Sequence, residues 1–259
     1  MPQNFLEYEL NEADWWSKWA RILWVSSGCY ALWSPAFRES FFNRIQIFER
    51  VEGFQRVVDL FRRAFNDSNW QPMVIASQQA CEKDLESQLL LAGYRQIDEL
   101  SVMNLTEPIK PRSHGFEVTE ISGTQLNSWC EVYLKSFYGS VDLLPLLSPV
   151  VSKCEADPRT TFLLAFKQMI PVGGLVLYRT ESLLGAYCVG TLPEYRGHGV
   201  ASSLLAYSSD FAVEHGLQLI LQTFIADGVE PMYRRLGFKR VYVKKVFEHQ
   251  TDGTAAEQT

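Results

Sequence analysis

The segment PEYRGHGVASSLL, residues 193–205, has the residue types and spacing best suited to binding a ligand. Gly197 and Gly199 stand beside Arg196, after an apolar strand pattern and before a helical one. Glycine costs conformational entropy on folding and adds nothing to a core, so two glycines at a helix start indicate that something approaches the backbone closely. A helix N-terminus offers four unpaired N–H groups and the positive end of the helix dipole, which together suit a phosphate. A turn whose glycines serve only the bend is the alternative.

Two common phosphate motifs do not fit these residues. A P-loop requires a lysine followed by Ser or Thr after its second glycine, and no lysine follows Gly199. A dinucleotide-binding turn requires a third glycine, where this chain has Ser202. It also requires an acid about 20 residues further on, whereas Asp227 falls in a different element. Both motifs are therefore excluded on their residues.

The longer segment VGTLPEYRGHGVASSLL, residues 189–205, resembles the acyl-CoA-binding motif of the GCN5-related N-acetyltransferases, the GNAT family. The core of that motif is [QR]-x-x-G-x-[GA], and its three defined positions are filled by Arg196, Gly199 and Ala201. Further on, MYRRLGF, residues 232–238, resembles the family's tyrosine-containing helix and the Leu-Gly-Phe that follows it. The resemblance covers about residues 183–241, and the family's fold and chemistry become expectations for that part.

The resemblance implies roles for three groups of residues. Strand backbone groups would bind the pantetheine arm and the thioester carbonyl, at Val189, Gly190 and Thr191. Amides at the helix start would hold the pyrophosphate, with Arg196 beside them; they belong to Gly197, His198, Gly199, Val200, Ala201 and Ser202. Tyr233 would protonate the departing thiolate, since a thiol has a pKa of about 8.5 and a phenol about 10. The alternative for Tyr233 is a half-buried helix aromatic. The implied co-substrate is acetyl-CoA, and no metal is implied.

Two positions depart from the family pattern and leave the general base unassigned. Many members carry an asparagine where this chain has Ala226, and some carry a basic glutamate where it has Leu221. Glu194 and Asp227 are nearby carboxylates, each with a solvated loop acid as the alternative. A base acting through ordered water, or no enzyme base, stays open. We expect His198 to face solvent or a CoA phosphate and not to act as the base.

Composition bounds the class of the protein. The 259 residues are 47% hydrophobic and 21% charged, an ordinary globular composition with room for two domains. A net charge of −6 disfavours a general nucleic-acid binder. The five cysteines and four histidines are scattered, which indicates reduced thiols, not a zinc site or a disulfide framework. The N-terminus lacks a signal-peptide pattern, and no apolar stretch approaches the ~20 residues of a membrane helix. We therefore expect a cytoplasmic protein that binds neither membrane nor nucleic acid.

The order of patterns along the chain indicates an α/β (α+β) fold, with a mixed, mostly antiparallel twisted sheet flanked by helices. Apolar spacing from Trp15 to Leu23 predicts a helical face near the N-terminus, and helices are also predicted over 124–137 and 199–215. The polar stretch 106–115, with two prolines and a glycine, is the best linker. Around Gly93 and Gly237 the chain repeats one pattern, a helix end, glycine, an aromatic residue and a strand, which two diverged copies would explain.

Two tandem GNAT-like copies are therefore expected. Residues 1–107 would form a degenerate N-terminal domain without a cofactor loop, and residues 108–250 the catalytic domain that binds acetyl-CoA. Residues 251–259 would form a disordered tail.

The expected function is that of an acyltransferase, which moves an acetyl group from acetyl-CoA to a primary amine by direct attack. The alternative is a non-catalytic acyl-CoA sensor or partner-binding module, which the missing asparagine favours and the retained Tyr233 opposes. Transfer of a succinyl or propionyl group is a third reading. The acceptor, a small-molecule or peptide amine, stays open, as does the oligomeric state. The acceptor surface is expected over residues 124–155 and in the N-terminal half.

Overall fold

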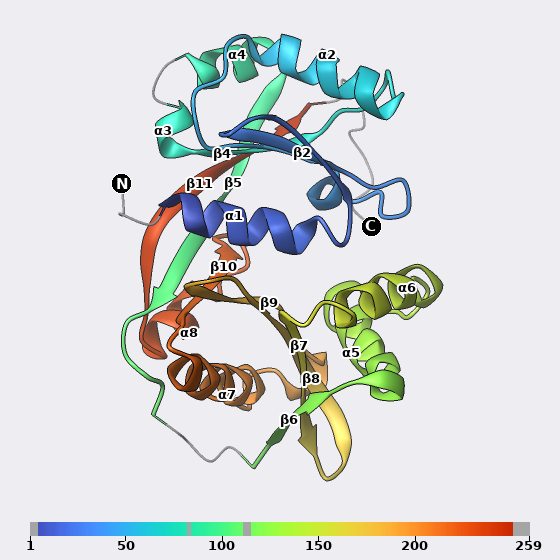
Figure 1. Cartoon of the computed structure of the whole chain (residues 1–259), viewed down its shortest axis with the longest axis vertical. Helices are drawn as coiled ribbons and strands as arrows, with labels where there is room; N and C mark the ends of the chain where they lie inside the picture. The colour runs from blue at the N-terminus through green and yellow to red at the C-terminus, as the bar shows by residue number, and fades with distance from the viewer. Residues whose placement is uncertain (1–4, 82–83, 111–114, 251–259) are drawn as a thin grey trace. The chain divides into compact units, whose positions relative to one another are not determined.

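The computed structural model describes residues 5–81, 84–110 and 115–250, and the chain divides into two compact units (Figure 1). Neither unit is one continuous piece of chain. The first comprises Met1–Lys18, Ser101–Thr223 and Asp227–Tyr242, and the second Trp19–Leu100, Phe224–Ala226 and Val243–Thr259. Strands β5 (Tyr94–Leu105) and β11 (Phe238–His249) contribute residues to both units. The expected disordered tail, 251–259, lies outside the described residues, as does part of the expected linker.

The first unit contains a mixed sheet, with the strand order β11-β5-β10-β9-β8-β7-β6. Four consecutive antiparallel strands are β6 (Glu117–Ile121), β7 (Thr160–Lys167), β8 (Ile170–Arg179) and β9 (Leu183–Thr191). Strand β10 (Gln218–Phe224) runs parallel to β9, and α7 (Val200–His215) connects the two. Helices α5 (Leu126–Tyr138) and α6 (Leu144–Glu155) lie on one face of this sheet and α7 on the other (Figure 1). The predicted fold class is therefore confirmed.

An aliphatic core joins α7 to the sheet. Val200, Leu204 and Leu205 face inward from one side of α7, as helical spacing requires, against buried leucines of β7 to β10. A Cβ on Gly173 of β8 would collide with the Val200 side chain, so glycine lets the start of α7 lie directly on the sheet. The first turn of α7 is thereby fixed over β8 and β9.

The second unit repeats this order of elements. Strands β1 (Arg21–Ser26), β2 (Cys29–Trp33) and β3 (Arg44–Ile47) are antiparallel, and α2 (Phe54–Phe65) leads to the parallel strand β4 (Met73–Ser77). Among the described residues, this unit also has three short helices: η1 (Ser40–Phe42) precedes β3, and α3 (Gln78–Cys81) and α4 (Leu85–Leu91) come after β4. Gly93 and Gly237, with φ of +83° and +100°, each precede a long final strand of 12 residues. The predicted tandem architecture agrees with this repetition.

The predicted apolar helix from Trp15 to Leu23 is wrong in its second half. Helix α1 covers Phe5–Trp16, and strand β1 begins at Arg21, where its backbone pairs with β2. The tryptophans divide between two cores: Trp15 stacks on Tyr187 in the first unit, and Trp19 stacks on Phe42 in the second. Apolar residues at i, i+4 and i+7 fitted a helix, but strand pairing decided the conformation after Trp16.

Charged groups attach the end of α1 to the residues just before β7, within the first unit. Lys18 Nζ lies 2.6 Å from Asp157 Oδ2, and Arg159 Nη2 lies 2.8 Å from the same oxygen. Arg159 also binds Asp14 of α1, at 2.5 Å. Hydrogen bonds from Arg159, and then from Lys18, lower the pKa of Asp157 well below its usual range, although partial burial opposes the shift.

We expect Asp157→Asn to reduce the acid sensitivity of the first unit. Since the pKa of Asp157 is depressed in the folded state, its ionised form contributes stability above the unfolded pKa of about 3.9, and that contribution is lost as pH falls further. Urea unfolding between about pH 6 and pH 2.5 should show a free energy of unfolding that falls less steeply below about pH 4 in the variant than in the wild type. Glu131→Gln removes an exposed ion pair with Lys135 and is the control, with little change in slope. Identical slopes for Asp157→Asn and wild type would contradict this assignment.

Candidate functional site

Strand β9 carries a bulge at the start of the stretch expected to bind a thioester. Its register with β8 pairs Val176 with Tyr187 but Gly174 with Gly190, so β9 has one extra residue there. Cys188 has a φ of +54°, in the left-handed region that non-glycine residues rarely adopt. Bulges of this kind redirect side chains and are common next to active sites.

The bulge changes which side chains face each helix layer. Leu184 and Ala186 pack in the core cluster with α7, and after the bulge Val189 packs against the same cluster. Gly190 then faces α5, because a Cβ placed on it would lie 3.1 Å from Ser136 Cβ. A regular strand would have put residues 184, 186 and 188 on one face.

Immediately before the bulge, β9 and β10 separate. Their parallel register ends at the pair Leu221–Ala186, although β9 continues to Thr191. The β9 backbone at Val189 and Gly190 therefore has no ladder partner in β10. Because unpaired N–H and C=O groups inside a protein cost free energy, an extended ligand with amide groups can complete this interrupted sheet.

The glycine turn leads from β9 to a helix start with free donors. Gly197 and Gly199 have φ of +78° and +93°, which glycine adopts without strain. The first α7 amide that bonds back is that of Ser203, to Gly199 O at 3.0 Å. Within the described parts of the chain, no acceptor is present for the preceding amides, those of Gly199, Val200, Ala201 and Ser202. Four donors thus converge at the positive end of a 16-residue helix.

Arg196 ties this turn to its neighbours. Its Nη2 donates to Ser136 O of α5 at 2.7 Å, and its Nε donates to Thr191 O at 3.4 Å. The positive charge lies at the turn, but its hydrogen bonds go to carbonyl groups of the protein. His198 is exposed, and its Nδ1 lies 2.9 Å from Arg196 O. The ring is therefore held at the surface of the turn.

Tyr233 lies on α8 (Glu230–Arg235) and belongs to the same core cluster as Val200. Val189 packs against this cluster. Only 6% of Tyr233 is exposed, and its ring meets Phe238 edge-on at 6.0 Å. Burial, with a smaller contribution from Asp227, raises the pKa of Tyr233 to about 12. The phenol is therefore protonated at neutral pH, as a proton donor must be.

Glu230 fixes the position of this helix. Its carboxylate, 8% exposed, lies 2.7 Å from Arg234 and 2.5 Å from Arg240 of β11. Burial opposes ionisation, but the hydrogen bonds from Arg240 and Arg234 prevail and lower the pKa of Glu230. An ionised clamp between α8 and β11 therefore holds the helix that carries Tyr233.

A comparison with protein-family models matches residues 158–240 to the Acetyltransferase (GNAT) domain. That match includes the β9 bulge, the glycine turn, α7 and Tyr233, which are the features described above. The chain contains a GNAT acetyltransferase domain. The family's chemistry is acyl transfer from acyl-CoA.

Solved structures show the same fold over most of the chain. A functionally unknown conserved protein from Staphylococcus epidermidis ATCC 12228 has 17% identity and a TM-score of 0.68, with 90% of this chain and 95% of that one covered. A GCN5-related N-acetyltransferase from Kribbella flavida has 16% identity and a TM-score of 0.66, with 94% and 95% covered. A tandem GNAT protein from the clavulanic acid biosynthesis pathway has 12% identity and a TM-score of 0.56, with 87% and 83% covered. The comparison with curated proteins gives no match.

The end of α5 contacts the GNAT strand β9, which sequence reasoning did not identify. Ser136 Oγ lies 3.2 Å from the position of a Cβ on Gly190, and Phe137 Cε2 lies at the same distance. The Ser136 hydroxyl is buried without a hydrogen-bond partner among the described residues. The predicted helix over 124–137 was the only available signal, since nothing in its spacing links Ser136 to a strand far along the chain.

Helix α1, which lies outside the matched segment, also packs on β9. Asn11 is fully buried, and its Oδ1 accepts a hydrogen bond of 2.6 Å from the Tyr187 hydroxyl. Its Nδ2 donates to Thr180 Oγ1 at 3.2 Å. Gly185 admits Asn11, because a Cβ there would lie 2.5 Å from Asn11 Oδ1. This bond holds β9 immediately before the bulge at Cys188.

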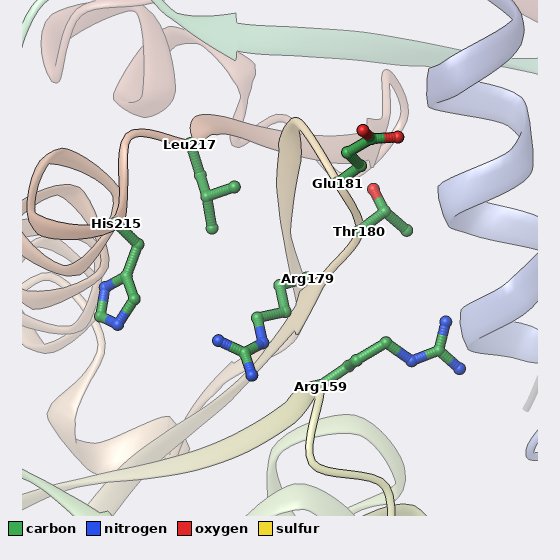
Figure 2. Close-up of a pocket in the computed structure, with 6 residues that line it drawn as sticks. All are labelled: Arg159, Arg179, Thr180, Glu181, His215 and Leu217. Carbon is green, nitrogen blue, oxygen red and sulfur yellow. The ribbon is translucent and has the colours of Figure 1, made fainter.

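The open pocket in Figure 2 lies elsewhere on the GNAT domain. It is lined by Arg159, Arg179, Thr180, Glu181, His215 and Leu217. His215 ends α7, whereas the free amides are at the start of that helix, about 24 Å away at 1.5 Å per residue. Because of this separation, the pocket is not the site assembled around the glycine turn. Its Arg159 side chain is bound to Asp157.

The described residues carry neither a metal-ligand cluster nor a membrane-spanning helix. No group of three or more His, Cys, Asp or Glu side chains there is arranged to hold a metal ion. No helix in the same part of the chain is long and apolar enough to cross a membrane. All five cysteines are free thiols.

Tyr187→Phe should destabilise the GNAT domain. Loss of the hydroxyl removes the short hydrogen bond that the buried Asn11 Oδ1 accepts, which costs about 1–3 kcal/mol of stability. Guanidinium unfolding of wild type and variant measures this loss. The control is Tyr207→Phe, whose hydroxyl binds the exposed Glu120 and should matter by less than about 0.5 kcal/mol. If the two variants lost equal stability, the Asn11–Tyr187 bond would not have the assigned role.

Proposed function

We propose that the protein transfers an acetyl group from acetyl-CoA to a primary amine on a small-molecule or peptide acceptor, in the cytoplasm. The observation that carries this proposal is the end of the β9–β10 ladder at Ala186, next to four free amides at the start of α7. One feature suits an extended amide chain and the other a pyrophosphate, and coenzyme A contains both, in its pantetheine arm and next to it.

The pyrophosphate binds at the turn in this proposal. Amides from Gly197 to Ser202 donate to its oxygens, for which the His198 amide leaves Tyr195 O, 3.4 Å away, and the dipole of α7 favours the negative charge. Arg196 adds a fixed positive charge while it holds Ser136 and Thr191. The pantetheine arm then lies along β9, where Val189, Gly190 and Thr191 supply backbone groups. A backbone donor of this strand polarises the thioester carbonyl.

The chemical step is direct aminolysis of the thioester. The amine nitrogen forms a bond to the acyl carbon, the carbon–sulfur bond breaks, and the sulfur leaves with the electron pair. Tyr233 gives its proton to this thiolate, the nitrogen loses one proton to solvent, and the tyrosinate regains one from solvent. Against a thiol of pKa about 8.5, a donor at about 12 makes that transfer unfavourable by about 5 kcal/mol. The same apolar surroundings raise the thiol pKa as well, which reduces the difference. Much of the rate gain comes from holding both reactants in line.

No enzyme base is assigned in this scheme. Leu221 is buried in the α7 core, and Ala226 offers no polar group. Glu194 and Asp227 are exposed, as solvated loop carboxylates are. The ammonium form of the amine loses its proton to solvent before the attack, so no carboxylate is assigned to that step.

The division of labour between the two halves is part of the proposal. Residues 108–250 bind acetyl-CoA and carry the reaction, whereas residues 1–107 lack a cofactor loop. In the second unit, the corresponding helix α2 has its first amide bonded to Gln88 Oε1 at 2.8 Å. The five free thiols support a reducing compartment, and the net charge of −6 supports an acceptor other than nucleic acid.

Glutamate in the turn should abolish acetyl-CoA binding. Ala201→Glu places bulk and negative charge at the expected pyrophosphate in helical backbone, and Gly199→Glu does so at a positive φ. By calorimetry we expect micromolar affinity for wild type and at least ~30-fold weaker binding for Ala201→Glu, which corresponds to about 2 kcal/mol. Val213→Glu adds the same charge at an exposed position near the other end of α7 and should bind as wild type does. Unchanged binding in folded Ala201→Glu would overturn the pyrophosphate assignment.

Tyr233→Phe distinguishes an enzyme from a non-catalytic acyl-CoA sensor. Loss of the hydroxyl should lower kcat at least ~10-fold, while the Kd for acetyl-CoA stays within ~3-fold, because only the proton transfer is affected. Release of free thiol with an amine panel measures kcat, and calorimetry measures Kd. Tyr207→Phe, on the surface of α7, is the matched control. A variant as active as wild type would show that Tyr233 is not the acid.

A further inference from the structure

The end of α5 and the start of α6 carry a run of exposed apolar side chains. We call residues 137–146 the apolar segment. Phe137 is 53% exposed, Tyr138 37%, Val141 37% and Leu146 41%. Isolated exposed apolar residues are ordinary, but four within ten consecutive residues form the kind of surface that binds an apolar partner.

The apolar segment begins against the strand expected to hold the thioester. Phe137 Cε2 lies 3.2 Å from the position of a Cβ on Gly190, so even a methyl group there would be in tight contact with the ring. One edge of Phe137 therefore borders β9, and the rest of the ring faces solvent. A molecule on that exposed face is next to the reacting bond of the proposed function.

Buried aromatic residues hold this surface in place. Tyr133 is 8% exposed, and its ring lies 4.9 Å from that of Phe137 and 6.1 Å from that of Tyr138. Tyr133 in turn stacks on the fully buried Trp129, at 5.3 Å and 11° between ring planes. A preorganised aromatic surface loses little side-chain entropy when an apolar group packs on it.

The charge of the apolar segment limits the kind of molecule that suits it. Its single ionisable group with a charge at neutral pH is Asp142, whose Oδ2 accepts a hydrogen bond from Ser140 at 3.0 Å. One carboxylate matches one ammonium group, whereas a polyamine or a basic peptide needs several acids to bind well. An anionic acceptor would be repelled by Asp142.

We propose that the acceptor is a monoamine carried on an apolar body, aromatic or aliphatic, which packs on Phe137 and Tyr138. Its nitrogen reaches the thioester beside Gly190, and Asp142 attracts its ammonium form before the proton is lost. This inference rests on the proposed function and names the substrate class of the same site.

A panel of four amines tests the substrate class. Phenethylamine and hexylamine represent the apolar monoamines, spermidine the polyamines, and ethanolamine the small polar amines. With acetyl-CoA saturating, thiol release should give kcat/KM values at least ~10-fold higher for the apolar pair than for the other two, about 1.4 kcal/mol in transition-state binding. Preference for spermidine or ethanolamine would overturn the inference.

Phe137→Ser locates the acceptor on the apolar segment. Because half of this side chain is exposed, the variant should fold, and Val141→Ser provides a second one. We expect KM for phenethylamine to rise at least ~5-fold in Phe137→Ser, with the Kd for acetyl-CoA unchanged. Leu91→Ser, at a side chain 90% exposed on α4, is the matched control. An unchanged KM in Phe137→Ser would overturn the inference.

Equilibrium binding separates failure of this inference from failure of the proposed function. Calorimetry would measure phenethylamine binding to the CoA-saturated protein, in wild type and Phe137→Ser. Binding that the variant weakens, without any acetyl transfer, supports the apolar site and overturns the transferase. Transfer to spermidine without phenethylamine binding supports the transferase and overturns the apolar site. A wild-type dimer that Phe137→Ser converts to a monomer, by light scattering, would assign the surface to a second copy of the chain and also overturn the inference.

Discussion

Parallel strands normally keep their ladder for as long as both run, because every N–H and C=O left unpaired inside a protein costs free energy. In the GNAT domain, β9 leaves its partner β10 after Ala186 and continues to Thr191. The bulge at Cys188 turns the strand, Asn11 holds it before the bulge, and Phe137 borders it afterwards. The glycine turn then begins where β9 ends. Strand groups and helix amides are thus presented together because the sheet is interrupted at this point.

Local chemistry was the part of the site that the sequence could reveal. Gly197 and Gly199 stand out because they adopt positive φ before a helix, which few other residues tolerate. The helices over 124–137 and 199–215 follow from apolar spacing alone. Asn11 is different, since its partner Tyr187 is 176 residues away and neither residue belongs to a short motif. The failed helix beyond Trp16 has a related cause: β1 exists because β2 pairs with it, and pairing is not visible in the spacing of one segment.

The second unit shows what the same topology is without the interruption. Its parallel strands β3 and β4 pair along the whole of β3, from Arg44 to Ile47, so no ladder groups are left open there. The turn before α2 contains Glu49 and Glu52, which would repel a pyrophosphate. The first amide of α2 already donates a hydrogen bond to Gln88 Oε1. Under the proposed function, the same topology therefore provides a cofactor site in the first unit and none in the second. The difference lies in a few residues at a single strand end.

In the proposed function, the two reactants are recognised by different kinds of atoms. A pyrophosphate on helix amides is bound by backbone, so the sequence must keep only glycines, one arginine and the bulge. Structural neighbours with 12–17% identity keep the fold although most of their residues differ. The surface offered by Phe137 and Tyr138 consists of side chains, which each chain can replace without losing the fold. In this proposal, the side chains of this chain's own α5 and α6 therefore determine the acceptor. Their rigid aromatic surface and one carboxylate favour a single ammonium group on an apolar body.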